Sequence, residues 1–156
     1  MNAPSSNYSV NVVVTQTGGA TTFNSATLTT STTYSNDIPL DRFSAADVYV
    51  AVSTLSGTLN VYVQKMRPGL NPGIDTPSLT DWVDIISFTQ MSGAAERMAS
   101  IVTAGNAEFA VQRGALTAGT IRTTALGRHW RVRCDLAGAG SGATVTLSTI
   151  AITFYA

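Results

Sequence analysis

The segment ADVYVAVSTLSGTLNVYVQKM, from Ala46 to Met66, decides the fold because apolar residues recur at every second position along both of its halves. One parity of each half is entirely apolar: Val48, Val50 and Val52 in the first, and Leu59, Val61 and Val63 in the second. A period of two is typical of strands, whose successive side chains point to opposite faces. Ser56-Gly57 lies between the halves and is a turn signal, so the segment is predicted to form a β-hairpin.

The same alternation continues through the rest of the chain. Further strands are predicted over the segments Tyr8–Thr15, Thr80–Gln90, Ala94–Val102, Ala107–Arg113, Arg128–Leu136 and the last residues from Val145 onward. A helical spacing competes with the strand pattern only in Ala94–Val102, and the strand is favoured because the segment that follows alternates again.

The final segment changes parity part-way along. Val145 and Leu147 have one parity, whereas Ile150, Ile152 and Phe154 have the other. An extra residue in a strand shifts the parity of everything after it. A one-residue bulge near Ser148 or Thr149 is therefore predicted, which would place all five apolar side chains on one face.

About eight strands joined by glycine-rich turns predict an all-β chain, folded as a two-sheet antiparallel sandwich of jelly-roll or Greek-key type. A single closed barrel is the alternative. The length of 156 residues suits a single domain. Residues 46–156 are expected to form the sandwich core. Residues 1–45, rich in serine and threonine, are expected to form a polar N-terminal arm and first strands that pack on the core or extend from it.

The composition points to a subunit of an assembly. Charged residues make up 12% of the chain, and nine basic residues balance nine acidic ones, whereas about 25% is usual. A lone unit with so little charge tends to associate.

The single cysteine, Cys134, excludes an intrachain disulfide. The first residues lack a secretory signal pattern and no run of about 18 apolar residues occurs, so we expect synthesis in a cytoplasm and no membrane-spanning helix.

The sequence offers no arrangement of residues that predicts an enzyme, a cofactor site or a metal site. His129 and Cys134 are five residues apart on one predicted strand, so they face opposite ways and cannot form a nucleophile and base pair. Asp81 and Asp84 are also separated by an odd number of positions, which argues against an acid and base pair of carboxylates. We therefore expect a protein that acts by binding.

Candidate contact residues follow from strands that are apolar on both faces, because a neighbouring subunit could supply the second covering layer. The cluster from Arg128 to Arg133 adds two outward arginines, which are expected to pair with acidic residues of a neighbour. Nucleic acid is a less favoured partner because the net charge is zero. The predicted subunit-contact residues are Tyr49, Tyr62, Trp82, Phe88, Arg131 and Arg133.

Several of these strand patterns together resemble a known group of proteins. The segments concerned are Gly57–Gln64, Trp82–Gln90, Leu116–Arg122 and Leu126–Arg133. From about Val48 to Phe154 the chain resembles small β-sandwich structural proteins of tailed bacteriophage virions, of the head decoration or cement type. The resemblance implies a non-enzymatic protein that assembles in many copies, often as trimers that tie adjacent capsomers together.

The residues and the resemblance lead to one functional expectation. The chain is expected to be a capsid decoration protein that binds and stabilises the shell of the major capsid protein. Its expected partners are itself, as a homotrimer, and the major capsid protein. Its expected location is the virion, after synthesis in the host cytoplasm. A tail component, such as a tube subunit, a terminator or a receptor-binding module, is the alternative.

Overall fold

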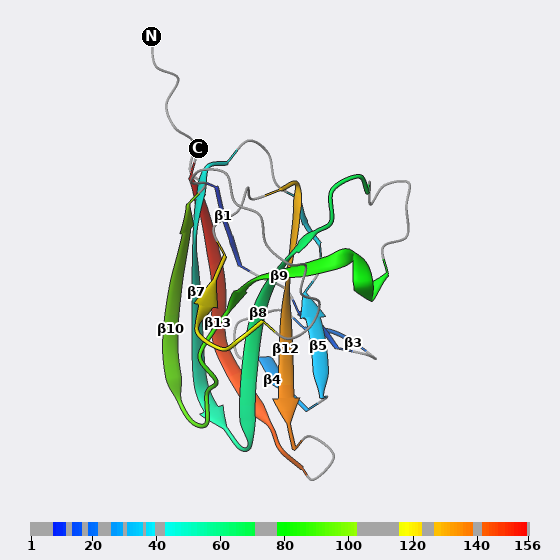
Figure 1. Cartoon of the computed structure of the whole chain (residues 1–156). Helices are drawn as coiled ribbons and strands as arrows, with labels where there is room; N and C mark the ends of the chain where they lie inside the picture. The colour runs from blue at the N-terminus through cyan, green and yellow to red at the C-terminus, as the bar shows by residue number, and fades with distance from the viewer. Residues whose placement is uncertain are drawn as a thin grey trace.

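The computed structural model describes residues 8–11, 14–16, 19–21, 26–29, 31–35, 37–39, 43–70, 78–102, 116–122, 127–138 and 142–155. Within these ranges the chain forms two antiparallel β-sheets that pack against each other (Figure 1). The predicted two-sheet sandwich is therefore confirmed. The predicted strand over Ala107–Arg113 lies outside the described residues.

Sheet A contains the long strands at one side of Figure 1. Its order is β1-β13-β7-β10, and β4 also pairs with β13. The bounds are β1 Tyr8–Asn11, β4 Ala26–Leu28, β7 Ala45–Leu55, β10 Ala95–Val102 and β13 Val145–Tyr155. The strand favoured for Ala94–Val102 is confirmed as β10, which is the last strand at its side of the sheet.

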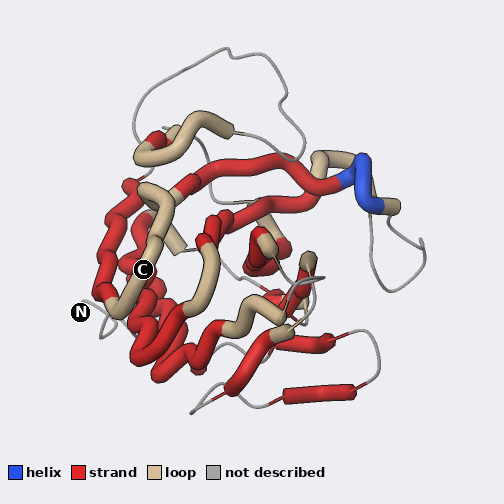
Figure 2. The backbone as a smooth tube through the Cα atoms, turned by 90° about the horizontal axis from the view of Figure 1, so that it is seen from below, coloured by secondary structure: helices blue, strands red, loops and turns tan. Residues whose placement is uncertain are grey.

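Sheet B has the order β11-β9-β8-β12-β5-β2-β3, and β6 also pairs with β12. The bounds are β2 Val14–Gln16, β3 Gly19–Thr21, β5 Thr32–Ser35, β6 Ile38–Pro39, β8 Thr58–Met66, β9 Trp82–Ser87, β11 Thr120–Ile121 and β12 His129–Ala137. One short 3-10 turn, η1 (Leu79–Asp81), precedes β9 and lies outside the strand layers (Figure 2).

Eight of these strands have the order of a jelly roll. Strands β4, β13, β7 and β10 run across sheet A, and β5, β12, β8 and β9 run across sheet B. Each pair of successive strands, β4 and β5, β7 and β8, β9 and β10, and β12 and β13, is divided between the two sheets. This arrangement is the double Greek key of the jelly roll. The short strands β1, β2, β3, β6 and β11 extend the two sheets.

The hairpin predicted for Ala46–Met66 is wrong, because its two strands do not pair. Strand β7 pairs with β13 and β10, whereas β8 pairs with β12 and β9. At the turn, the backbone N–H of Ser56 donates to the carbonyl of Thr144, and Gly57 has a φ of +97°. The turn predicted at Ser56-Gly57 is present, but it carries the chain from one sheet to the other.

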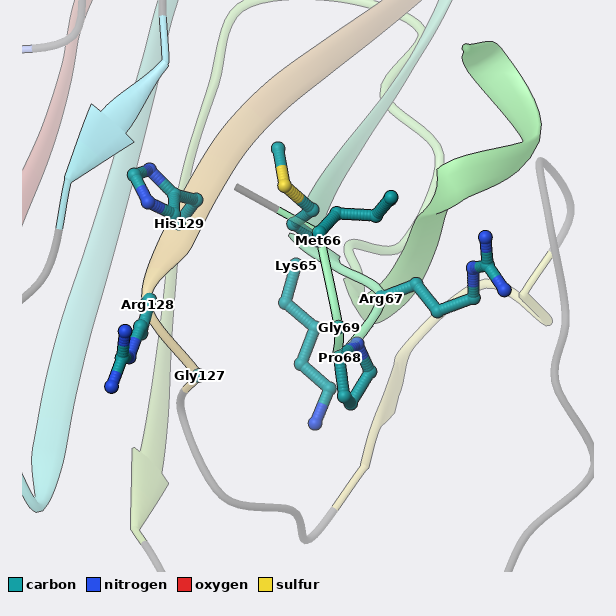
Figure 3. Close-up of a pocket in the computed structure, with 9 residues that line it drawn as sticks. Lys65, Met66, Arg67, Pro68, Gly69, Gly127, Arg128 and His129 are labelled. Atoms are coloured by element: carbon teal, nitrogen blue, oxygen red, sulfur yellow. The ribbon is translucent and has the colours of Figure 1, made fainter. Parts of the chain in front are cut away.

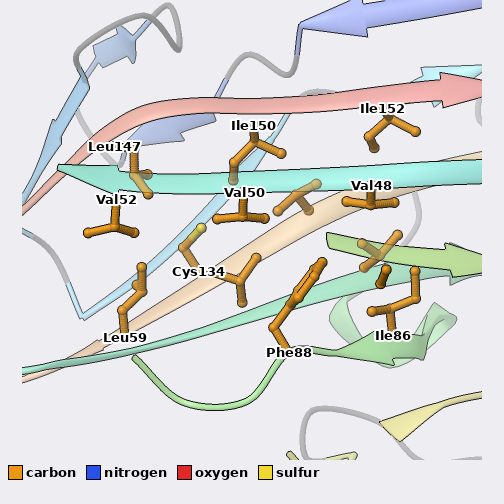
Figure 4. Packing of buried hydrophobic residues seen from close by; sticks show 14 of the residues in the cluster. Val48, Val50, Val52, Leu59, Ile86, Phe88, Cys134, Leu147, Ile150 and Ile152 are labelled. Atoms are coloured by element: carbon orange, nitrogen blue, oxygen red, sulfur yellow. The ribbon is translucent and has the colours of Figure 1, made fainter. Parts of the chain in front are cut away.

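The core lies between the two sheets and is built from the apolar parity of each strand (Figure 4). All the residues of β7 and β8 that the alternation predicted for the core are buried: Val48, Val50, Val52, Leu59, Val61 and Val63. In β13 the register shifts around Leu147, and all five predicted apolar side chains are buried: Val145, Leu147, Ile150, Ile152 and Phe154. The predicted bulge is confirmed. Each such aliphatic side chain contributes about 1.5–3 kcal/mol relative to exposure.

Candidate functional site

The structure places the six predicted contact residues in two different environments. Four of them are buried within the chain itself: Tyr62, Trp82, Phe88 and Arg131. Arg133 is half-buried, and Tyr49 is partly exposed on the outward side of sheet A. The chain therefore covers both faces of β9 by itself, and the two-sided apolar pattern of this strand does not require a neighbouring subunit.

The buried Arg131 belongs to a polar network on the outward side of sheet B. Its Nε donates to Gln64 Oε1 over 2.8 Å, and Gln64 Nε2 donates to Asp84 Oδ1 over 2.6 Å. The backbone N–H of Leu116 donates to Asp84 Oδ2 over 3.0 Å. The Arg131 guanidinium also lies 4.2 Å from the ring centroid of Tyr34. These contacts join β12, β8, β9 and the segment before β11.

Aromatic stacking explains why this arginine is tolerated in a buried position. The Arg131 guanidinium lies 4.4 Å from the ring centroid of Trp82, as well as close to Tyr34, and both distances are within cation–π range. Burial lowers the pKa of Arg131 to about 10, so the side chain stays charged at neutral pH. The neighbouring Arg133 pairs with Asp135 over 2.7 Å. Both arginines therefore have partners within the subunit.

The opposite side of the sandwich carries an accessible surface that we call the sheet A face. It consists of the outward residues of β7, β10 and β13: Ala45, Asp47, Tyr49, Ala51, Glu96, Met98, Ser100, Val102, Thr149, Ala151, Thr153 and Tyr155. Met98 and Val102 are 70% and 57% exposed, so no described part of the chain covers that side. A surface patch of exposed apolar residues is typical of an interaction site.

The carboxylates of the sheet A face accept hydrogen bonds from neighbouring hydroxyl groups. Asp47 accepts from the hydroxyl of Ser100 over 2.5 Å and from that of Tyr155 over 2.7 Å. Burial and the adjacent carboxylate of Glu96, which accepts a hydrogen bond from Tyr49, raise the pKa of the Tyr49 hydroxyl. The acidic groups thus have partners within the subunit, which lowers the cost of covering the face with another protein.

A second accessible feature is a pocket of about 430 Å³ at the end of sheet B where β8 finishes and β12 begins (Figure 3). We call it the cationic pocket, because Lys65, Arg67, Arg128 and His129 contribute to its lining. Its apolar walls come from Met66, Pro68 and Leu70. Its volume is within the range of about 300–1,000 Å³ that is typical of ligand pockets.

The residues considered for catalysis are either buried or in contact with other groups of the subunit. Cys134 is buried in the core, and burial raises the pKa of its thiol to about 12. His129 Nδ1 lies 2.8 Å from Asp37 Oδ2. Asp81 accepts hydrogen bonds from Ser78 and Arg67. Within the described ranges, no group of three or more His, Cys, Asp or Glu side chains could hold a metal ion, and no helix has the length and hydrophobicity to cross a membrane.

Comparison with known protein families finds no family that matches the chain, and a search of curated proteins finds no match.

The sequence contains signals for both accessible features. Met98 and Val102 share the parity opposite to the core residues Ala99 and Ile101 of the same strand, and this pattern predicts an exposed apolar row once the strand is accepted. For the cationic pocket the signal was weaker. Lys65 lies near the end of a predicted strand and Arg128 follows Gly127 at the start of another, but only the pairing of β8 with β12 brings them together.

Proposed function

We propose that this chain is a structural subunit of a tailed bacteriophage particle, and specifically a decoration protein that binds the outside of the capsid shell. The observation that carries the proposal is the exposed, weakly charged sheet A face with Met98 and Val102. Its support also includes the zero net charge of the chain and the resemblance of its strand patterns to virion structural proteins. The jelly-roll fold is compatible with this role and with many others.

The shape of the sheet A face suits docking against a broad partner surface. Alanines occupy positions 45, 51 and 151 of the face, and Met98 and Val102 are its most exposed large apolar side chains, both on β10. Burying each of these two side chains would contribute up to about 1.5–3 kcal/mol. A stable interface buries about 800 Å² on each partner, so Tyr49 and Tyr155 would be covered as well. We propose the major capsid protein as the occupant of this face.

Assembly in many copies accounts for the low charge of the chain. Charge repulsion between copies is weak when the net charge is zero, so neighbouring decoration subunits can lie close together on a shell. We propose that the subunits associate as homotrimers, as the resemblance implies. Each trimer would then present several copies of the sheet A face, and multivalent contact would raise the overall affinity.

Co-sedimentation with capsids that lack the protein tests the proposal. The wild-type chain is expected to pellet with the capsids and to saturate at a fixed ratio. The double variant Met98→Ser, Val102→Ser is expected to lose most of this binding, because it removes the apolar contacts of the face. The control Leu79→Ser removes a side chain that is 63% exposed on η1 and should bind normally. Binding only to tails would instead support a tail component, and no binding to either particle would contradict the proposal.

A further inference from the structure

Strand β10 has an open edge, which the proposed function does not use. It is the last strand at its side of sheet A (Figure 1), and within the described ranges it pairs only with β7. In an antiparallel ladder, every second residue of an edge strand directs its N–H and C=O groups away from the neighbouring strand. The eight residues of Ala95–Val102 therefore present a row of backbone groups with which another strand could pair.

This edge has few of the features that prevent strands from pairing. Natural edges are commonly protected by proline, by lysine, by a bulge or by a short strand. β10 is eight residues long, contains neither proline nor lysine, and pairs with β7 without a register shift. One protective feature is present, because the charged Arg97 shares the inward parity of the buried Ala99 and Ile101. A strand that joins this edge must therefore accommodate a cation.

A groove of about 150 Å³ lies beside the edge, between β10 of sheet A and β9 and β11 of sheet B. Arg97 and Ala99 line one side of it, and Phe88 and Ile121 contribute to the other. Ile121 is 45% exposed, so the groove has an uncovered apolar wall. An apolar cavity of about 150 Å³ is large enough for benzene, and this groove can therefore receive one aliphatic side chain.

Arg97 supplies the charge at this groove. Its side chain is exposed and forms no ion pair with any residue that the structure describes. Its Nη1 instead donates to the backbone carbonyl of Glu96 over 3.1 Å. The carboxylate of Glu96 belongs to the sheet A face, where it accepts a hydrogen bond from Tyr49. A carboxylate on the inward side of an added strand would give Arg97 an acidic partner across the two strands.

We infer that the edge of β10 binds an extended segment of a partner protein, which adds a strand to sheet A and places a glutamate beside Arg97 and an aliphatic side chain in the groove. The described pairings of sheet A are all antiparallel, so the added strand would run antiparallel to β10. Its aliphatic residue, opposite Ala99, would then precede the glutamate by two positions. In such strand addition, main-chain hydrogen bonds provide affinity and alternate side chains provide specificity. The inference is independent of docking through the sheet A face.

A second copy of this chain fits the edge less well. If two β10 strands paired within one continuous sheet, each would place the same four residues on the inward side: Ala95, Arg97, Ala99 and Ile101. Glu96 would remain on the outward side, so neither copy of Arg97 would gain a carboxylate. Charge complementarity therefore favours a different chain as the occupant.

Fluorescence anisotropy with a labelled synthetic peptide tests the inference on the full chain. The probe has about eight residues, which is within the usual length of a strand, with leucine two positions before glutamate and threonine elsewhere. Saturable binding is expected, and it should slow the hydrogen exchange of amides in Ala95–Val102. Two further peptides are N-methylated at alternate backbone positions. Only the one whose methyl groups face β10 should lose affinity, by at least about tenfold, because it loses main-chain hydrogen bonds.

Protein variants test the side-chain part of the inference. Arg97→Gln should weaken binding by about three- to fivefold at low salt, which is the upper part of the range for an opposite-charge pair between strands. Ile121→Ser, which removes the exposed apolar wall of the groove, should weaken binding by a similar factor. The matched control is Arg128→Gln, which removes an exposed arginine that does not line the groove and should bind like wild type. With a peptide that carries glutamine in place of glutamate, Arg97→Gln should have no effect.

Three outcomes would overturn the inference. The first is the absence of saturable peptide binding. The second is an equal effect of the two N-methylation patterns, or an equal loss of affinity in Arg97→Gln and Arg128→Gln. The third is a self-associated form of the chain in which the amides of β10 are protected from exchange without any peptide, which would make the edge a contact between copies.

The test does not depend on the stability of the variants or on the capsid experiment. Arg97, Ile121 and Arg128 are exposed, so their variants should fold, and thermal unfolding followed by circular dichroism verifies this for each one. Capsid binding is measured with changes at Met98 and Val102, so the two proposals fail separately.

Discussion

Replacing Asp84 by alanine should strongly destabilise the subunit, although the residue lies on the outward side of sheet B. Asp84 is fully buried and accepts hydrogen bonds from the side chain of Gln64 and the backbone of Leu116. The variant leaves both donors buried without an acceptor. A buried donor without a partner costs about 1–3 kcal/mol, so the free energy of unfolding should fall by about 2–6 kcal/mol. Domains are usually stable by only about 5–15 kcal/mol.

Urea unfolding followed by tryptophan fluorescence measures this loss, because both tryptophans are buried: Trp82 in the network and Trp130 in the core. The matched control is Asp135→Ala, which removes a carboxylate from the half-buried pair with Arg133. This variant should lose at most about 1 kcal/mol. If Asp84→Ala loses no more than Asp135→Ala, the network does not hold the outer layer of sheet B, and our reasoning is wrong.

Three further predictions concern single residues. Gly57→Ala should lower the free energy of unfolding by more than about 2 kcal/mol, because a non-glycine residue is strained at positive φ and its Cβ would lie 2.5 Å from the carbonyl oxygen of Ala137. The control Gly93→Ala, which has open space around it, should lower it by less than about 1 kcal/mol in the same urea assay. The Cys134 thiol, with a pKa raised to about 12, should react with a thiol reagent at pH 8 only after unfolding, and rapid labelling of the native protein would contradict its burial. Hydrogen bonds lower the pKa of Asp81 below its ordinary 3.8. The ionised carboxylate therefore stabilises η1 fully above pH 3.8, and this contribution is lost as the pH falls through the lowered pKa. A midpoint at or above 3.8 in an NMR titration of this carboxylate would refute the prediction.

Local patterns in the sequence were sufficient to predict the strands of the core. Alternation identified the buried parity of β7 and β8, and the parity change between Leu147 and Ile150 predicted the bulge in β13. Each of these features depends on residues close together in the chain. The strand pairing depends on distant residues. Ser56-Gly57 has the local pattern of a turn, but whether the next strand stays in the same sheet depends on β12, β13 and β9.

The outward side of sheet B shows why the predicted site was incomplete. Arg131 was expected to face outward, and it does so beside Gln64, yet both side chains are buried. Tyr34 and Trp82 lie against the guanidinium, and the segment that begins at Leu116 bonds to the network. These contacts join segments that lie far apart in the sequence. Alternation predicts the face on which a side chain lies, but it does not predict what covers that face.

Electron cryomicroscopy of complete phage particles tests the central proposal most directly. We predict density for this jelly roll at regular positions on the outer surface of the capsid, with the sheet A face turned toward the major capsid protein. Met98 and Val102 should lie inside the contact. Particles in which the protein is present only in the tail, or in which β10 faces solvent while another surface touches the shell, would contradict the account.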